Sequence, residues 1–316
     1  MTGTSKEANG MARVWRIAGL VLRLVVVPSL AVWLVFALVS QESARDWAVA
    51  DSPKLLLGLA IYHVALWLFA ERMRTTLSLF EIAISRAAAF RIYLQSIVYF
   101  FLVPMSVSIE ISRYLKIKAL QPDLEFKWLA PAVFMDRLIG FCSSVLFAVV
   151  LGVMLVPISL DQVTVLSAGA VLAALGAVAV IYAIRRYSEW LSEILHAVFR
   201  HPAKTALPIV ISLLMQCVTG LGVWLCAEAL GVNAPYLNVL FGVAAGNLAM
   251  IVPVSLFGGG PSEVAGAAAF LVTGIDSSDA ILLVAILYSL KLMAALEGAA
   301  LEILKGGIEA LRFNRK

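Results

Sequence analysis

Long apolar runs follow one another along the whole chain, separated by short polar stretches. A membrane-spanning helix needs about 20 mostly apolar residues. Because six runs reach this length, one of them with the help of its flanks, the pattern predicts an all-α integral membrane protein. The six expected spans are 17–39, 55–70, 129–156, 162–184, 206–230 and 279–304.

Two further apolar stretches are interrupted, one from Phe90 to Ser108 and one from Leu237 to Leu271. A proline inside a helix removes a backbone hydrogen bond, so each stretch is expected to break there. We expect both stretches to form re-entrant hairpins that return to the side from which they entered. The residues expected at the breaks are Pro104, Ser106, Pro253, Ser255, Gly258, Gly259 and Gly260.

The basic residues predict the orientation of this arrangement. With six spans and two re-entrant hairpins, 19 of the 24 Lys and Arg residues fall on the side of the N-terminus. Only Arg45 and Lys54 fall on the other side, while Arg23, Arg137 and Lys291 lie inside spans. Basic residues concentrate in cytoplasmic loops, so both termini are expected in the cytoplasm.

The two interrupted stretches resemble each other. Residues 101–106 read Phe-Leu-Val-Pro-Met-Ser, and residues 250–255 read Met-Ile-Val-Pro-Val-Ser. An acid and then a base follow each motif, 27 residues apart in the first copy and 28 in the second: Glu110 with Arg137, and Glu263 with Lys291. Three expected spans separate the motifs, which inverts the second copy relative to the first. Inverted repeats with broken helices are typical of transporters.

We therefore expect residues 1–316 to form a single membrane domain. Its parts are a cytoplasmic tail (1–16), a first repeat-containing half (17–156), a linking region (157–205) and a second repeat-containing half (206–316). Within the linking region, residues 186–200 place their apolar side chains on one helical face, which predicts an amphipathic helix at the membrane surface.

Composition excludes a soluble body. Hydrophobic residues make up 62% of the chain and charged residues 14%, with a mean hydropathy of +0.97. Soluble domains carry about 25% charged residues. The net charge of +4 comes from separate short clusters, so we expect no nucleic-acid partner. The three histidines are scattered and no phosphate-binding or zinc motif occurs, so we expect neither a metal nor a cofactor.

Charged residues inside the apolar segments are the candidate site. A charge at the centre of a membrane helix costs about 2.5–3.5 kcal/mol, so each is expected to find a partner or a polar cavity. Asp136 and Arg137 are adjacent and point about 100° apart on a helix, so they cannot pair well with each other. We expect one of them to pair across the repeat with Lys291, Glu297 or Glu263. The full candidate set is Glu110, Arg113, Asp136, Arg137, Glu263, Lys291 and Glu297.

Two readings of these charges remain open at this point. They either join helices as salt bridges or line a polar cavity for a substrate. Pro261 suits the first position of a new half-helix, whose N-terminal N–H groups favour a phosphate. Glu263 in its first turn either complements the helix dipole or titrates during transport.

These motifs resemble those of the lysylphosphatidylglycerol synthetase transmembrane region, a flippase-like family of membrane proteins. Residues 104–115 are similar to that family's first motif, roughly Pro-x-Ser-x-Gly-Gly-Asp/Glu-x-x-Arg-x-Tyr-x-Leu, and residues 136–140 match its Asp-Arg-Leu-x-Gly. Residues 253–263 resemble its second motif, and the likeness covers about residues 15–310. The sequence departs from the pattern at Ser108 and Ile109, where paired glycines are usual, and at Ser262, where an Arg often stands.

The resemblance implies a stand-alone translocase part without a soluble aminoacyl-transfer domain, located in the bacterial cytoplasmic membrane. Members of the family are associated with moving aminoacylated phospholipids, lipid-linked sugars or hopanoid-related lipids. We expect a flippase rather than an enzyme, in which Arg137, Lys291 and Arg113 hold the lipid phosphate. Two alternatives remain: a membrane-embedded transferase that uses a polyprenyl-phosphate donor, and a non-catalytic partner of envelope biosynthesis enzymes.

Overall fold

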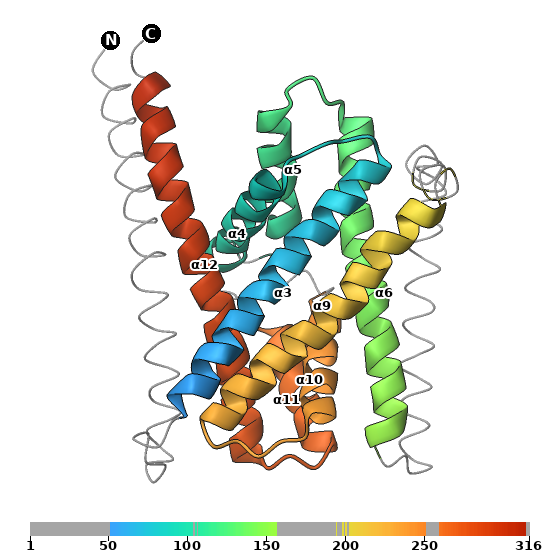
Figure 1. Ribbon diagram of the computed structural model, residues 1–316, viewed down its shortest axis with the longest axis vertical. Helices are drawn as coiled ribbons and strands as arrows, with labels where there is room; N and C mark the ends of the chain where they lie inside the picture. The colour runs from blue at the N-terminus through green and yellow to red at the C-terminus, as the bar shows by residue number, and fades with distance from the viewer. Residues whose placement is uncertain are drawn as a thin grey trace, which may run out of the picture. The chain divides into compact units, whose positions relative to one another are not determined.

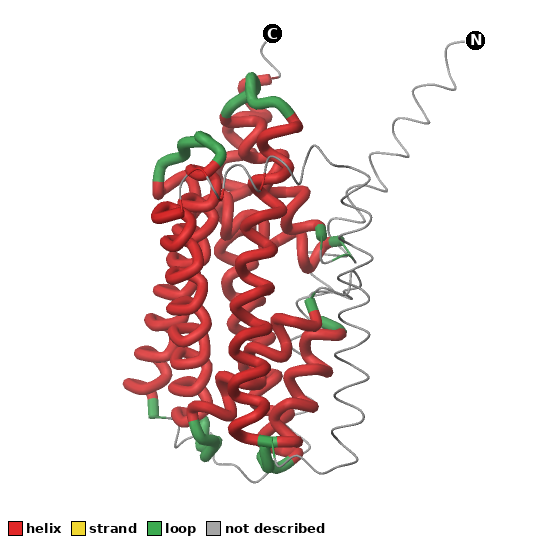
Figure 2. The backbone as a smooth tube through the Cα atoms, turned by 90° about the vertical axis from the view of Figure 1, so that its right-hand side faces the viewer, coloured by secondary structure: helices red, strands yellow, loops and turns green. Residues whose placement is uncertain are grey.

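The computed structural model describes residues 51–156 except 104 and 106, residues 194, 198 and 200, and residues 202–250 and 259–313, with side chains through Ile303. These residues form helices joined by loops, and no strand occurs among them (Figure 2). The helices are α3 (Ser52–Leu79), α4 (Arg86–Leu102), α5 (Ser108–Leu120), α6 (Phe126–Leu155), α9 (Pro202–Ala229), α10 (Tyr236–Ala249), α11 (Pro261–Val272) and α12 (Ser277–Phe313).

Four of these helices, α3, α6, α9 and α12, are long and apolar enough to cross a membrane. At about 1.5 Å per residue, the 28 residues of α3 reach about 42 Å, more than the roughly 30 Å of a hydrocarbon core. They correspond to four of the six expected spans. The other two, 17–39 and 162–184, lie outside the described residues, as does most of the expected surface helix 186–200.

The helix α3 is much longer than the apolar run 55–70 from which it was expected. At its start, the Asp51 side chain accepts a hydrogen bond from the Lys54 backbone N–H (3.2 Å), which caps the first turn. At its end, the helix continues through the largely polar stretch 71–78. This extension carries Arg72 into the helix bundle, which matters for the site.

Each interrupted stretch forms two short helices. The four helices α4, α5, α10 and α11 contain 17, 13, 14 and 12 residues. Their lengths of about 18–26 Å fall short of the hydrocarbon core, so none crosses it alone. The helix α11 begins after Gly260, whose φ of 141° suits only glycine. The other expected break residues, Pro104, Ser106, Pro253, Ser255 and Gly258, lie outside the described residues.

The helix order long, short, short, long occurs twice, as α3–α4–α5–α6 and as α9–α10–α11–α12. Both α3 and α9 have 28 residues, and both end in the same turn. In that turn the N–H of Ile82 bonds to Leu77 O (3.1 Å), and the N–H of Val232 bonds to Ala227 O (2.9 Å). The residues before them, at 81 and 231, both have positive φ, as in a Schellman motif.

The first helices of the two sets pack side by side in opposite directions (Figure 1). Near the start of α3, Gly58 meets Gly222 and Cys226 of α9; further along, Arg72 reaches back to Ser212. A Cβ on Gly222 would lie 3.0 Å from a backbone nitrogen of α3, so these small residues allow close backbone contact. The last helix of each set packs on the other set, α12 on α4 and α6 on α10.

Candidate functional site

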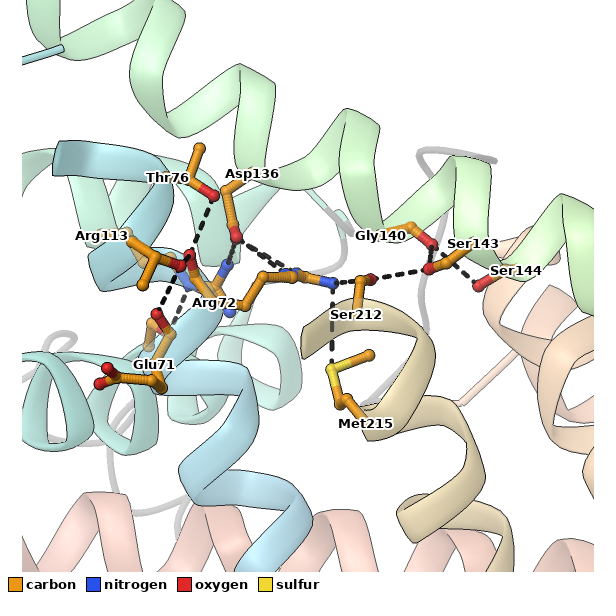
Figure 3. A network of polar contacts seen from close by, with 12 residues as sticks. Glu71, Arg72, Thr76, Arg113, Asp136, Gly140, Ser143, Ser144, Ser212 and Met215 are labelled. Carbon is orange, nitrogen blue, oxygen red and sulfur yellow. Dashed lines mark hydrogen bonds and ion pairs between the residues drawn. The ribbon is translucent and has the colours of Figure 1, made fainter. Parts of the chain in front are cut away.

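A buried charge cluster joins α3, α5 and α6 (Figure 3). The Asp136 carboxylate accepts from Arg72 Nε (2.9 Å) and Nη2 (3.2 Å), and from Arg113 Nη1 (3.2 Å). The exposed fractions are 1% for Asp136, 5% for Arg72 and 7% for Arg113. One carboxylate therefore faces two guanidinium groups, and these three side chains carry one net positive charge.

The surroundings of the cluster fix both guanidinium groups. Arg113 Nε donates to Ser96 Oγ (3.2 Å), and its guanidinium lies over the Tyr93 ring at 4.8 Å. Arg72 Nη1 donates to Ser212 Oγ (3.2 Å) on α9. A Cβ on Gly140 would lie 2.5 Å from Arg72 Nη1. The glycine of the Asp-Arg-Leu-x-Gly motif thus provides the space that Arg72 occupies.

Polar contacts continue from this cluster toward α10. Ser212 Oγ lies 2.7 Å from Ser143 Oγ, which connects α9 to α6. Gln216, one turn along α9, donates to Ser144 Oγ, and its side-chain oxygen accepts from Asn247 Nδ2 (3.0 Å). Asn247 lies in the last turn of α10. Ser143 and Ser144 both donate to the Gly140 carbonyl, so a line of hydrogen bonds runs through the described bundle from Arg72 toward the second break.

The side chain of Arg137, the residue next to Asp136, contacts the two helix breaks and not the Asp136 cluster. Its Nη1 lies 2.7 Å from Glu110 Oε2 in the first turn of α5. Its Nη2 donates to the carbonyl oxygen of Met250 (3.0 Å), the residue that ends α10. Because a helix leaves its last carbonyl groups without partners inside the helix, Arg137 supplies one. A single side chain thus connects the start of α5 to the end of α10.

The second acid–base pair lies at the start of α11. Lys291 Nζ donates to Glu263 Oε1 (2.9 Å) and lies 3.4 Å from Ser262 Oγ. The other carboxylate oxygen, Glu263 Oε2, accepts from the Gly260 N–H (2.8 Å) and from Ser262 Oγ (2.6 Å). Glu263 therefore caps its own helix while it pairs with Lys291, as a first-turn carboxylate does.

Glu297 has a different partner from those expected. Its Oε1 lies 2.8 Å from His63 Nε2 of α3, while His63 Nδ1 lies 2.9 Å from the Leu59 carbonyl. This contact joins α12 to α3. Among the described residues, no group of three His, Cys, Asp or Glu side chains could hold a metal ion.

The expected pairing of Arg137 or Asp136 with Lys291, Glu297 or Glu263 is wrong. Each hairpin's base pairs with its own acid, because α5 packs on α6 and α11 packs on α12. The similar spacing of 27 and 28 residues is compatible with this pairing but does not by itself predict it. Across the breaks, Arg137 contacts the backbone carbonyl of Met250 in the other set.

Arg72 and His63 are the residues that sequence reasoning missed. The apolar run ends at residue 70, so the sequence places Arg72 among the 19 basic residues expected on the cytoplasmic side. His63 was recognised only as one of three scattered histidines. The full length of α3 and the position of its neighbours show the partners of both side chains. His63 meets Glu297 on α12, and Arg72 meets Asp136 on α6.

A family model described as lysylphosphatidylglycerol synthase TM region matches residues 20–295 of the chain. The matched range includes both acid–base pairs and the Asp136 cluster. It covers α3, α6 and α9 in full and α12 as far as residue 295. Comparison with curated proteins and comparison with solved structures gave no match.

Proposed function

Because the chain belongs to the family of lysylphosphatidylglycerol synthase transmembrane regions, we propose that it moves a lipid headgroup across the bacterial cytoplasmic membrane. It is a multi-pass membrane protein, of a family associated with lipid headgroup modification or translocation. In this proposal the protein transports a lipid or a lipid-linked saccharide and carries out no covalent chemistry.

In this proposal, six spans and two re-entrant hairpins form an inverted repeat with both termini in the cytoplasm. Three features of the described helices support it. The order of long and short helices occurs twice, the two first helices run antiparallel, and the last helix of each set packs on the hairpin of the other. Transporters of this architecture bind their substrate where the broken helices meet.

The observation that carries the proposal is the position of Arg137. Its guanidinium shares its donors between Glu110 of the first hairpin and the Met250 carbonyl at the second break. Arg137 and Glu110 are only partly buried, with side chains 25% and 18% exposed, unlike the closed Asp136 cluster. A lipid phosphate can replace Glu110 on the guanidinium, since phosphate and carboxylate oxygens both accept charge-assisted hydrogen bonds from arginine.

The second pair completes a neutral site. Lys291 and Glu263 offer one donor group and one acceptor group to a headgroup that carries a phosphate together with hydroxyl or amino groups. An amino group of the same headgroup would pair with the displaced Glu110, so that no bare charge stays in the bilayer, where it would be costly. Arg113 does not bind the phosphate in this proposal. Its donors bond to Asp136 and Ser96 and so hold α5 in place.

The test is transbilayer movement in vesicles. Purified protein is reconstituted with fluorescent-headgroup lipids, and a membrane-impermeant reductant reports how fast inner-leaflet lipid becomes accessible. We expect faster exchange with wild type and a large loss with Arg137→Gln. Lys127→Gln is the matched control, because the Lys127 side chain is 56% exposed and pairs with Glu125 near the surface end of α6. Folded wild-type protein that accelerates no anionic, zwitterionic or glycosylated lipid would refute the proposal.

One observation favours a transferase as the second candidate. The Ser262 hydroxyl donates to Glu263 Oε2 at 2.6 Å, within the reach that a general base requires. Lys291 lies 3.4 Å from the same hydroxyl. Ser262→Ala separates the two functions: a transferase that uses this hydroxyl loses product formation, whereas a translocase keeps its lipid exchange rate within about twofold, the effect of one weak hydrogen bond.

A further inference from the structure

The two hairpins differ at the start of their second helix. In the second hairpin, Glu263 caps α11 by accepting from the Gly260 N–H. In the first hairpin, Glu110 holds the same place in the first turn of α5, but its carboxylate pairs with Arg137 on α6. The residue before α5, Val107, provides no side-chain hydrogen bond. The start of α5 therefore has no side-chain cap.

A cavity of about 180 Å³ lies beside this start, between the end of α4 and the first turns of α5. Its walls are mostly apolar and include Val103, Met105, Ile111 and Leu115. Three of these side chains are also open to the outside, with exposed fractions of 46% for Met105, 52% for Ile111 and 58% for Leu115. In a membrane protein such an apolar rim contacts lipid.

Ser112 is the unusual polar group of this cavity. It is 4% exposed, and its Oγ has no hydrogen-bond partner. Among the described side chains, only one other buried polar atom lacks a hydrogen bond, Glu110 Oε2, and that atom is in the ion pair with Arg137. A buried hydroxyl without a partner is unfavourable, which points to a ligand that accepts from it.

The second hairpin lacks this feature. The residue two positions after its acid is Ala265, where the first hairpin has Ser112 two positions after Glu110. The apolar cavity wall and the unpaired hydroxyl therefore occur together only in the first of the two described hairpins.

Water suits this cavity poorly. A buried water needs two to four polar partners, but the other polar wall groups already have partners. Ser108 Oγ donates to the Tyr99 carbonyl (3.0 Å), and Lys116 Nζ donates to both oxygens of Glu302 (2.7 Å each). A ligand with an apolar body and one acceptor oxygen matches the remaining surface better.

We propose that this cavity binds the acyl-ester region of a glycerophospholipid. The ester carbonyl accepts from Ser112 Oγ, and the attached chain lies along Ile111 and Leu115 toward the surrounding lipid. Lys116, one turn further on the same face, carries a third donor toward the phosphate end. The inference rests on the proposed function, because it makes the first hairpin the place where a substrate lipid enters.

The experiment compares two phosphatidylglycerols with the same headgroup and chains, one ester-linked and one ether-linked. The ether analogue lacks the carbonyl acceptor. Binding of each lipid to the purified protein in detergent is measured by native mass spectrometry. For wild type we expect the ester lipid to bind about 2- to 10-fold more tightly, the value of one hydrogen bond. For Ser112→Ala we expect the two lipids to bind equally.

Thermal stability without added lipid gives an independent readout. Ser112→Ala removes an unpaired hydroxyl, so its melting temperature should equal or exceed that of wild type. Ser143→Ala is the matched control: its hydroxyl is bonded to Ser212, so its melting temperature should fall while the ester preference stays. An equal ester-to-ether ratio in wild type and Ser112→Ala would overturn the inference, as would a fall in melting temperature for Ser112→Ala as large as for Ser143→Ala.

The outcomes also separate this inference from the proposed function. An ester preference that depends on Ser112, in a protein that does not accelerate lipid exchange, keeps the binding site and refutes translocation. Lipid exchange without any ester preference keeps translocation and refutes the site.

Discussion

Neutralising Asp136 should destabilise the protein more than neutralising its partner Arg113. The Asp136 carboxylate is the shared acceptor of Arg72 and Arg113, and all three residues are at most 7% exposed. In Asp136→Asn, two guanidinium groups remain buried within reach of one another without a counter-ion. Breaking one buried pair by removing a partner costs about 3–5 kcal/mol, and this change breaks two.

Arg113→Met provides the contrast. It removes the Arg113 hydrogen bonds to Asp136 and Ser96 but leaves the carboxylate paired through two bonds with Arg72. The three-residue cluster changes from one net positive charge to none. We expect a loss of about 1.5–3 kcal/mol, the value of a hydrogen bond to a charged group.

The assay is SDS-induced unfolding in mixed micelles, followed by tryptophan fluorescence, with the free energy of unfolding compared among wild type and both variants. The order of stability should be wild type, then Arg113→Met, then Asp136→Asn. An Asp136→Asn protein within about 1 kcal/mol of wild type would show that the excess positive charge is compensated elsewhere, and the argument from burial would fail.

Two of the three remaining predictions use the same assay, and the one on Gly298 uses the yield of folded protein. Gly140→Ala should cost about 1–3 kcal/mol, because its Cβ would lie 2.5 Å from Arg72 Nη1 and the arginine must move. Gly298→Ala should cost more, since its Cβ would lie 2.1 Å from a backbone oxygen of α4, which moves less easily; a drop in folded yield on size-exclusion chromatography would report it. Glu81→Gly should raise the free energy of unfolding by about 1 kcal/mol, because Glu81 has a φ of 62°, and a loss would contradict the turn geometry.

The long helices and the breaks could be predicted because they depend on local properties of the chain. The length of an apolar run predicts a span, and a proline or glycine cluster in such a run predicts a break. The exact ends were harder, since capping extends a helix into polar sequence: Asp51 adds residues at the start of α3, and the turn at residues 80–82 sets its end.

The partners of the buried charges could be predicted only in part. The similar spacing of Glu110 to Arg137 and of Glu263 to Lys291 indicated two equivalent acid–base sets, and the described structure contains two such pairs. Which acid meets which base depends on which helices pack together, and no sequence period encodes that. The same reason explains why Arg72 was not expected to pair with Asp136 across 64 residues.

The antiparallel helices α3 and α9 have a close backbone contact near one end and a side-chain hydrogen bond further along. At Gly58 and Gly222 the two backbones lie in close contact, so a change in the crossing angle about this point moves the distant parts of the helices most. Arg72 lies 14 residues further along α3, about 21 Å from this contact. A change of about 5° in the crossing angle moves that level by about 2 Å, which is enough to break the 3.2 Å hydrogen bond from Arg72 to Ser212. The crossing angle of α3 and α9 therefore decides whether the Asp136 cluster stays hydrogen-bonded to α9 through Ser212.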